Sequence, residues 1–524
     1  VLPGWTVESI DDLGYRLQWK GLAEQRNVGI VTEVMQRDLL RHRLHSVVDE
    51  MGALLCRTAI STNIRERLDF SCAVLNASGQ LISSAPHIPV HLGALGVCVR
   101  ESVGTFELRE GDTLISNHPA FGGSHLPDVT LITPVFVGDH LVGYVANRAH
   151  HAEIGGITPG SMPPNASCLE EEGVVIAPRY LVRGGRSCFD EVAELFCAAR
   201  YPTRSLADNL ADLHAQLAAN RQGAERLREL AVGHGDQWSV LLDDILEHSA
   251  AVMRSALGRL PVTSVAEQQL DDGSRIVVCL RRVNDGLRID FRGTSMVHPG
   301  NLNATTAIVR SAVLYALRVW LEQDLPLNEG LLVPVQFVCP EGMLNPKFTG
   351  NSACDPAVVG GNVEVSQRLV DTLFLALDVQ ACSQGTMNNL LFGNDRFGYY
   401  ETIAGGSGAG NGYDGADALH THMTNTAITD AEILEMRFPV RLWRFAVRSE
   451  SGGAGQWRGG NGVVREFEFL RPLTVSILSQ HRVEAPYGLA GGNCGQCGEQ
   501  WLHPSDGASP IRLAGCVQIS VLPG

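Results

Sequence analysis

Apolar residues recur at helical spacing in four stretches of the chain. The first is residues 31–57, and residues 205–260 also have a mainly helical pattern, with breaks expected at the glycines of AVGHGD. Two shorter stretches, residues 311–322 and 363–379, are predicted to form buried helices. The sequence therefore predicts helices near the start and through the middle of the chain.

Strand patterns occupy much of the remaining chain, bounded by turn sequences rich in Gly, Asp and Asn. Residues 68–84 predict two strands around a turn at 76–79, and residues 262–292 are rich in strand with a turn at 271–273. Beyond residue 398 the chain is rich in glycine, with short strands in RLWRFAVRSE, GVVREFEFL and LTVSILS. We predict an α+β fold, a large chain with mixed or antiparallel sheets and a helical middle segment. The expected parts are residues 1–25, 26–200, 201–260, 261–397 and 398–524.

One hairpin is predicted in more detail. Residues 129–137 and 141–149 have strand patterns, and Gly138-Asp139 between them suits a two-residue turn with Gly first. Pro134 lies within the first strand, so this strand is expected to lie at an edge or to contain a bulge. The pairing is therefore open to a shift of one residue.

The register of this hairpin decides which histidine approaches the loop before it. With regular pairing from the turn outward, Asp128 falls opposite Ala149, and His150 lies beside the loop although 22 residues separate it from Asp128. A shift of one would put His151 in place of His150, because adjacent strand residues point to opposite faces. We expect His150 to be the residue near the loop.

Residues 117–156 concentrate histidines with the spacing of metal ligands. His125 and Asp128 are three residues apart in a loop rich in Gly and Pro, and His150 approaches them through the hairpin. Imidazole nitrogen and carboxylate oxygen together suit divalent cations such as zinc, manganese or iron. Two histidines and one aspartate that converge on one loop indicate a metal or catalytic site.

Three further polar stretches have two interpretations each. His87 and His91 lie beside prolines and either pack in a loop or form a wall of the site. Residues 405–412 either close on a ligand or form an ordinary glycine-rich loop. The stretch SQGTMNN either forms a turn network or binds a polar substrate through side chains and backbone N–H groups. Its candidate substrate-binding residues are Ser383, Gln384, Gly385, Thr386 and Asn388.

Composition excludes several classes of protein. No apolar run approaches the roughly 18 residues of a membrane span, and no cationic leader precedes an apolar stretch, so no membrane partner is expected. The 13 cysteines are an odd number spread along the chain, which indicates reduced thiols and a cytoplasmic protein. The formal net charge of −16 disfavours a nucleic-acid partner.

Nucleotide-binding motifs are also missing from the sequence. A P-loop needs Gly-Lys followed by Ser or Thr, whereas the lysines of this chain, Lys20 and Lys347, are followed by Gly21 and Phe348. The GxGxxG match that starts at Gly410 does not open a helix, so dinucleotide binding is not expected. We therefore predict no nucleotide cofactor site in the chain itself.

Ordered blocks along nearly the whole chain resemble the family of hydantoinase B, 5-oxoprolinase and the acetone carboxylase alpha subunit. The longest is STNIRERLDFSCAVLNASGQLISSAPHIPVHLGALG at residues 61–96. The others are GGSHLPD (122–128), RAHHAEIGGITPGS (148–161), CDPAVVGGNVEVSQR (354–368), SQGTMNN (383–389), MTNTAITDAEILEMRFPVRL (423–442), SGGAGQWRGGNGVVRE (451–466) and APYGLAGG (485–492).

The resemblance implies a two-component, ATP-dependent system. A separate A-type subunit, similar to sugar kinases and actin, would bind ATP and Mg and phosphorylate the substrate. The present chain would be the B-type partner in a hetero-oligomer and would complete the reaction at a metal site. The metal ligands carried over by position are His125, Asp128 and His150, for one divalent ion, with His151 either orienting a ligand or acting as general acid or base.

The function implied first is hydrolysis of a cyclic amide, a 5-oxoproline or hydantoin-like ring, coupled to ATP. The alternatives are an alpha-like subunit of an ATP-dependent ketone carboxylase and a non-catalytic scaffold of the same fold. The chain departs from the family pattern at His118, where Asp is frequent, and at Glu153, where HHADIGG is usual. Both departures lie beside the predicted metal loop.

Overall fold

The computed structural model describes residues 5–9, 15–19, 33–85 and 88–524. The chain divides into two compact units, residues 1–43 and residues 44–524. In the first unit, strands β1 (Trp5–Ser9) and β2 (Tyr15–Trp19) form an antiparallel hairpin. Helix α1 (Glu33–Thr58) begins in the first unit and ends in the second. The finer division at residues 200, 260 and 397 stays a prediction.

A seven-stranded sheet contains the hairpin described above. Its strands lie in the order β4-β3-β7-β6-β5-β8-β9, and every neighbouring pair is antiparallel. The strands are β3 (Phe70–Leu75), β4 (Leu81–Ser84), β5 (Thr113–Ser116), β6 (Asp128–Val137), β7 (His140–His150), β8 (Arg179–Arg183) and β9 (Arg186–Ser187).

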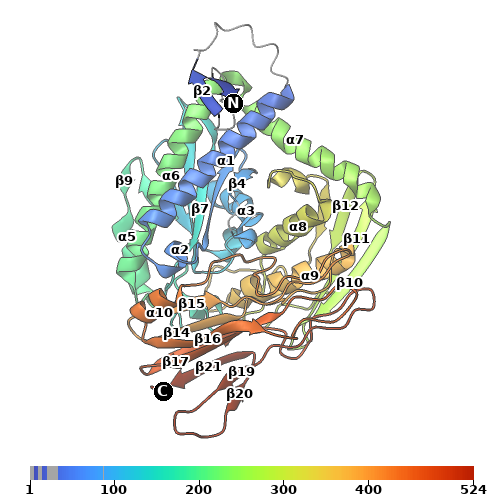
Figure 1. Cartoon of the computed structure of the whole chain (residues 1–524). Coiled ribbons are helices and arrows are strands. Elements are labelled where there is room, and N and C mark those ends of the chain that lie inside the picture. Colours follow the sequence, from blue (N-terminus) through green and yellow to red (C-terminus); the bar gives the residue numbers. More distant parts are fainter. Residues whose placement is uncertain (1–4, 10–14, 20–32, 86–87) are drawn as a thin grey trace. The chain divides into compact units, whose positions relative to one another are not determined.

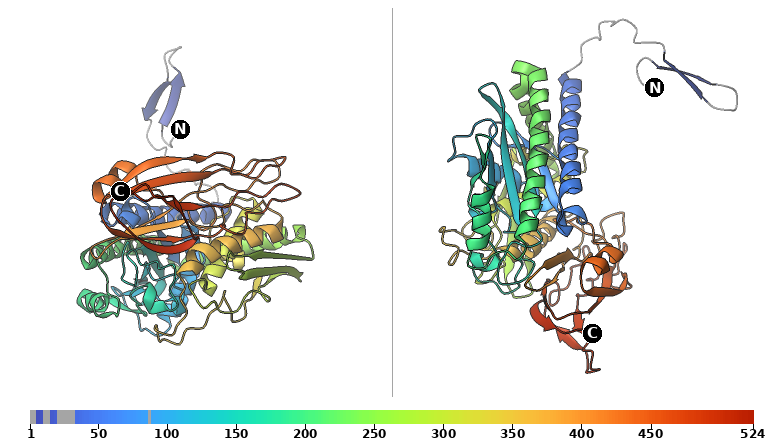
Figure 2. Two further views of the ribbon diagram at one scale, coloured as in Figure 1. Left: turned by 90° about the horizontal axis from the view of Figure 1, so that it is seen from below. Right: turned by 90° about the vertical axis from the view of Figure 1, so that its left-hand side faces the viewer.

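Helices cover both faces of this sheet, so its central strands are buried on both sides. On one face, α6 (Leu206–His234) packs along β6 and β7, as Figures 1 and 2 show, and α5 (Phe189–Ala198) adds Phe196 to the same core. On the other face, α3 (Ala94–Val103) packs Leu95 and Val99 against Ala73 and Ile132 of the sheet. Alternate residues of β6 and β7 therefore face α6 and α3.

A four-stranded mixed sheet packs with three helices in a second core. Strands β10 (Thr263–Gln269), β11 (Arg275–Val283) and β12 (Gly286–Asp290) are antiparallel, and β13 (Val335–Val338) pairs with β12 in parallel. Apolar side chains of this sheet pack with those of α7, α8 and α9 in one core. These helices are α7 (Trp238–Ala256), α8 (Thr306–Leu321) and α9 (Ser366–Leu377). A π-helical turn, Gly361–Val365, leads into α9.

The glycine-rich last part of the chain is built from strands, drawn in orange to red in Figure 1. One sheet has the order β15-β14-β18-β21, and two hairpins pair β16 with β17 and β19 with β20. The strands are β14 (Asn389–Gly393), β15 (Gly398–Thr402), β16 (Val440–Arg448), β17 (Gly462–Phe469), β18 (Leu473–Leu478), β19 (Gln500–Leu502), β20 (Ile511–Leu513) and β21 (Cys516–Val521). The short helices elsewhere are α2 (Thr62–Arg65), α4 (Leu169–Glu172) and α10 (Ala431–Arg437).

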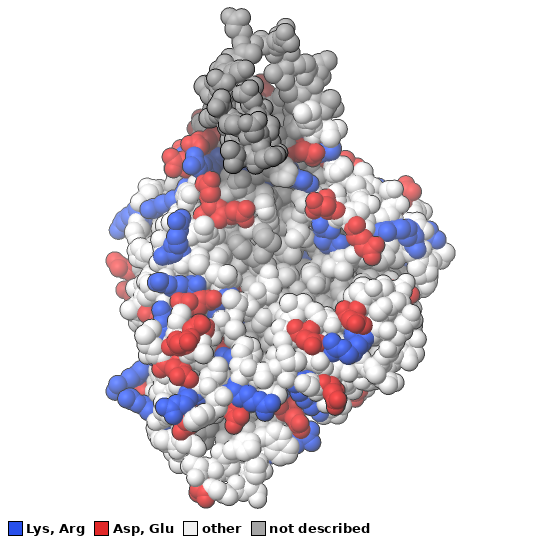
Figure 3. Space-filling view, in the orientation of Figure 1, with Lys and Arg blue, Asp and Glu red and all other residues white. Residues whose placement is uncertain are grey.

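The α+β prediction is confirmed, with separate antiparallel and mixed sheets and a helical middle segment. None of the helices in the described residues is long and apolar enough to cross a membrane. All 13 cysteines lie in the described part of the chain, and none is in a disulfide. On the face in Figure 3, acidic and basic side chains alternate and do not gather into a basic patch.

The predicted register of the β6–β7 hairpin is wrong by one residue. We expected Asp128 opposite Ala149, but Asp128 pairs with His150, and Ala149 pairs with Val129. Directly paired residues point to the same face of a sheet. Asp128 and His150 therefore lie side by side on the α3 face, and the next residue, His151, points the other way.

The shift arises close to the turn. Phe136 pairs with Leu141, whereas Val135 pairs with Gly143, so β7 contains one more residue than β6 at this point. Pro134 is the next residue of β6 and cannot donate a ladder hydrogen bond. We expected the strand with Pro134 to lie at an edge or to contain a bulge, but β6 is an inner strand and the extra residue lies in β7. The effect of this bulge is to bring His150 to Asp128 instead of replacing it by His151.

Gly143 lies at this irregularity, directly against the neighbouring strand β3, and its lack of a side chain permits the close approach. A Cβ there would come 2.4 Å from the carbonyl oxygen of Leu75. We predict that Gly143→Ala lowers the free energy of unfolding by about 1–3 kcal/mol, because the backbone must shift, as measured by urea unfolding. The control is Gly233→Ala in α6, where nothing lies within 4 Å of an added Cβ. Equal stability of the two variants would contradict the prediction.

Candidate functional site

The three predicted ligands meet where the hairpin of β6 and β7 opens away from its turn. Asp128 is the first residue of β6 and His150 the last residue of β7, and they are paired. His125 lies in the loop three residues before Asp128 and reaches the same face. His125 Nε2 is 3.3 Å from Asp128 Oδ2, and His150 Nδ1 is 3.5 Å from Asp128 Oδ1. The sequence prediction that these residues converge is confirmed.

Two more ionisable residues belong to this cluster. His91 Nε2 lies 3.1 Å from Asp128 Oδ2, and its Nδ1 is 3.0 Å from the hydroxyl of Ser71. Asp69 Oδ2 is 3.8 Å from His150 Nδ1. His91 is thus part of the wall of the site, the second of the two interpretations above, whereas His87 lies outside the described residues. Asp69 was missed, because only the pairing of β3 with β7 brings it here.

Tyr400, from the last third of the chain, closes the cluster together with Arg67. The ring of Tyr400 stacks on that of His150 with centroids 4.8 Å apart and an angle of 15° between the planes. The guanidinium of Arg67 lies over the ring of Tyr400, with its carbon 4.3 Å from the ring centroid. Arg67 also donates to the Tyr400 carbonyl at 2.9 Å. The His150 ring is therefore fixed by packing as well as by the strand.

Several buried donor and acceptor atoms of the cluster have no hydrogen-bond partner. They are both ring nitrogens of His125, Nε2 of His150 and Oδ1 of Asp128. These three side chains are at most 2% exposed. An unpartnered polar atom in a protein interior is costly and rare. A metal ion fits such a set, because it could take one nitrogen of each histidine and the free oxygen of Asp128.

The space between these atoms is small. The cavity is about 10 Å³ and is lined by the cluster together with Ile88, Asn362, Met387 and Thr424. A volume of about 10–15 Å³ holds a single water-sized object. The site can therefore accept one ion or one water molecule in this conformation. Asn362, on the π-helical turn, adds another unpartnered oxygen, Oδ1.

Electrostatics put the ligands in the forms that bind metals. Burial raises the pKa of Asp128, but His125 and His91 outweigh burial and hold that pKa well below its usual range. Burial lowers the pKa of His150, although Asp69 and Asp128 act in the opposite direction. Asp128 is therefore a carboxylate and His150 a neutral imidazole at neutral pH, as ligation requires.

His151 lies on the other face of the sheet. Its Nε2 is 3.1 Å from Oε1 of Gln216, and its Nδ1 accepts from the amide of Asn209, also at 3.1 Å. Both partners belong to α6. The ring nitrogens of His151 are thus occupied by α6, and these contacts favour the orienting role over proton transfer. The catalytic role of His151 stays a prediction.

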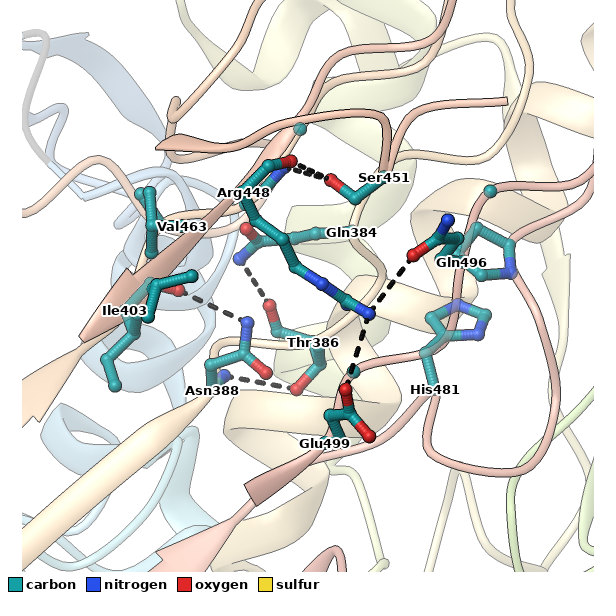
Figure 4. Close-up of a pocket in the computed structure, with 18 of the residues that line it drawn as sticks. Gln384, Thr386, Asn388, Ile403, Arg448, Ser451, Val463, His481, Gln496 and Glu499 are labelled. Atoms are coloured by element: carbon teal, nitrogen blue, oxygen red, sulfur yellow. Dashed lines mark hydrogen bonds and ion pairs between the residues drawn. The ribbon is translucent and has the colours of Figure 1, made fainter. Parts of the chain in front are cut away.

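The SQGTMNN stretch contributes to two cavities. Met387 lines the small cavity beside the histidines. Four of the five predicted substrate-binding residues line a separate cavity of about 1540 Å³ in the glycine-rich part, namely Ser383, Gln384, Thr386 and Asn388. Figure 4 shows Gln384, Thr386 and Asn388 in its wall, near Arg448 and His481. Their part in substrate binding stays a prediction.

The two departures from the family pattern have structural contacts. His118 caps a short helical turn, accepting at Nδ1 from the Ala120 amide at 3.1 Å. Glu153 accepts from the backbone of Gly155 at 2.6 Å and forms an ion pair with Arg204 at 2.9 Å. Neither side chain is among those that line the small cavity. Their identities therefore shape the loops around the site and not its donor set.

A sequence profile described as hydantoinase B/oxoprolinase matches residues 33–524. The chain belongs to the hydantoinase B/oxoprolinase family. A curated relative, 5-oxoprolinase 1 of Arabidopsis thaliana, is 44% identical over 507 residues, which cover 91% of this chain and 39% of the relative. The chain thus spans well under half the length of that relative.

Two solved structures share the fold. The ATP-dependent caprolactamase from Pseudomonas jessenii has a TM-score of 0.85 at 25% identity and covers 94% of this chain and 89% of its own. A nucleotide-free acetone carboxylase has a TM-score of 0.79 at 19% identity, covering 90% of this chain and 67% of its own. The second likeness concerns the fold alone. The predicted family resemblance is confirmed.

Substitutions of the neighbouring residues His150 and His151 test which of the two histidines is a metal ligand. We predict that His150→Ala removes tight binding of Mn²⁺, because it deletes an inward-facing nitrogen, and that His151→Ala keeps it. His151→Ala should instead lower the free energy of unfolding by about 1–3 kcal/mol, since it leaves Gln216 and Asn209 without a buried partner. Titration calorimetry and urea unfolding measure the two effects. Loss of Mn²⁺ from His151→Ala alone would contradict the assignment.

Proposed function

We propose that this chain is the B-type component of an ATP-dependent cyclic-amide hydrolase that opens a 5-oxoproline or hydantoin-like ring. The observation that carries the proposal is the buried set of unpartnered atoms on His125, Asp128 and His150. Such a set is suited to one divalent cation, zinc, manganese or iron. The names of the relatives, 5-oxoprolinase and caprolactamase, point to cyclic amides as the substrate class.

The metal would supply a Lewis acid for a carbonyl or phosphoryl oxygen, or lower the pKa of a bound water. The residues around it have distinct parts in this scheme. His91 and the Ser124 hydroxyl hold Oδ2 of Asp128, so that Oδ1 stays free. Tyr400 and the strand end fix the ring of His150, which leaves its Nε2 unpartnered. Burial excludes bulk water from all of these groups.

ATP enters this scheme through a second protein. The sequence has no P-loop, and lactams without ring strain need coupling to an energy source before they open. The Arabidopsis relative extends far beyond the matched region. We propose that an A-type subunit binds ATP and Mg, activates the substrate and forms a permanent complex with this chain. Such interfaces commonly bury about 2,000 Å² or more.

The proposal is tested by turnover of the co-expressed pair. We expect ATP-dependent opening of 5-oxoproline, hydantoins or other lactams, and loss of that activity in His125→Ala. The matched control is His140→Ala, an exposed histidine at the turn end of β7, which should keep wild-type activity. Product analysis by mass spectrometry measures ring opening. Turnover of ketones with bicarbonate, and of no lactam, would instead establish the carboxylase alternative.

A second measurement tests the division of labour. The isolated chain should hydrolyse no ATP in the presence of substrate, because no nucleotide site is recognisable in its sequence. Adding the A-type subunit should start ATP turnover, followed by phosphate release. Substrate-dependent ATP hydrolysis by the isolated chain would refute the two-component scheme.

A further inference from the structure

A second buried cluster of metal-ligating side chains lies in the wall of the large cavity. Asp371 belongs to α9, Cys382 follows that helix, and His481 follows β18. One ligand atom of each of the three lies within 4.8 Å of the others. All three are buried, and Cys382 and His481 line the cavity of about 1540 Å³. Figure 4 shows His481 at its edge.

One oxygen of the Asp371 carboxylate is held and the other is free. Oδ1 accepts from the Ser383 amide at 3.1 Å and lies 2.9 Å from Nε2 of His422. Oδ2 is buried and has no hydrogen-bond partner. A carboxylate fixed through one oxygen, with the other left unsatisfied, is oriented as a monodentate metal ligand.

The imidazole of His481 is oriented in the same sense. Its Nδ1 bonds the carbonyl of Glu484, so Nδ1 carries the proton and Nε2 keeps its lone pair. Nε2 points to Sγ of Cys382 at 3.6 Å. Tetrahedral zinc with usual Zn–S and Zn–N lengths holds sulfur and nitrogen about 3.5 Å apart. This pair is therefore already at the separation that zinc needs.

Gly385 shows that Nε2 and Oδ2 face one space. A Cβ on Gly385 would lie 2.3 Å from Nε2 of His481 and 3.0 Å from Oδ2 of Asp371. The φ of Gly385 is +59°, a conformation that glycine adopts without strain. The missing side chain at this position leaves the donor atoms room to converge.

We propose that Asp371, Cys382 and His481 form a second metal centre, which binds zinc through Oδ2, Sγ and Nε2. Thiolate and imidazole favour zinc over magnesium or calcium, and the two anionic ligands balance its charge. Because two of the ligands line the large cavity, the remaining position is open to water or to a ligand there. The proposal stands apart from the proposed function, since its residues lie outside the His125–Asp128–His150 cluster.

Binding of Co²⁺ to the 524-residue chain tests the centre. A thiolate bound to Co²⁺ absorbs strongly in the near ultraviolet, and no cysteine lines the small cavity at the His125 cluster. We expect this band to reach its full intensity when one equivalent of Co²⁺ per chain occupies the second centre. The band should disappear when Zn²⁺ displaces the Co²⁺, and Cys382→Ser should lack it. Zinc content should fall by one equivalent per chain in that variant. Cys494→Ser is the matched control and should keep the band, because Cys494 is exposed, lies in the sequence Cys494-Gly-Gln-Cys497 and is not among the proposed ligands.

Gly385→Ala provides a variant that keeps all three ligands. Its Cβ would occupy the space between Nε2 and Oδ2, so we expect cobalt affinity to fall by about 10- to 100-fold, with the fold checked by circular dichroism. This variant decides the matter if Cys382→Ser does not fold. A wild-type chain that binds cobalt without a thiolate band, or a band that persists in Cys382→Ser, would overturn the proposal.

Discussion

The pairing of Asp128 with His150 across β6 and β7 is the contact on which the first candidate centre depends. Both residues end their strands on the same face, so a carboxylate and an imidazole meet without leaving the sheet. The extra residue of β7 near Gly143 creates this pairing, because regular pairing would have placed Ala149 there. A backbone irregularity near the turn thus decides the chemistry at the opposite end of the hairpin.

The two clusters share one arrangement of charge. In each, one carboxylate oxygen is held by the protein: Oδ2 of Asp128 by His91 and Ser124, and Oδ1 of Asp371 by Ser383 and His422. In each, the other oxygen is buried without a partner. Burying an isolated carboxylate is unfavourable, and nearby imidazoles offset that cost. The free oxygens are then oriented toward the remaining donor atoms.

Distant parts of the chain are joined at these sites. Tyr400, from the glycine-rich part, stacks on His150 of the seven-stranded sheet. Met387 lines the small cavity, while its neighbours Thr386 and Asn388 line the large one. The SQGTMNN stretch is therefore a shared wall between two cavities.

The sequence by itself determined the elements whose signals are local. Helices and hairpins followed from the periodicity of apolar residues and from turns such as Gly138-Asp139, and His125 and Asp128 were found because they are three residues apart. Tertiary structure alone decided what depends on non-local pairing. The bulge in β7, the arrival of Asp69 through β3, and the meeting of α9 with the loop after β18 follow from packing. Register and side-chain convergence depend on contacts between residues far apart in the chain, and these contacts leave no periodic mark in the sequence.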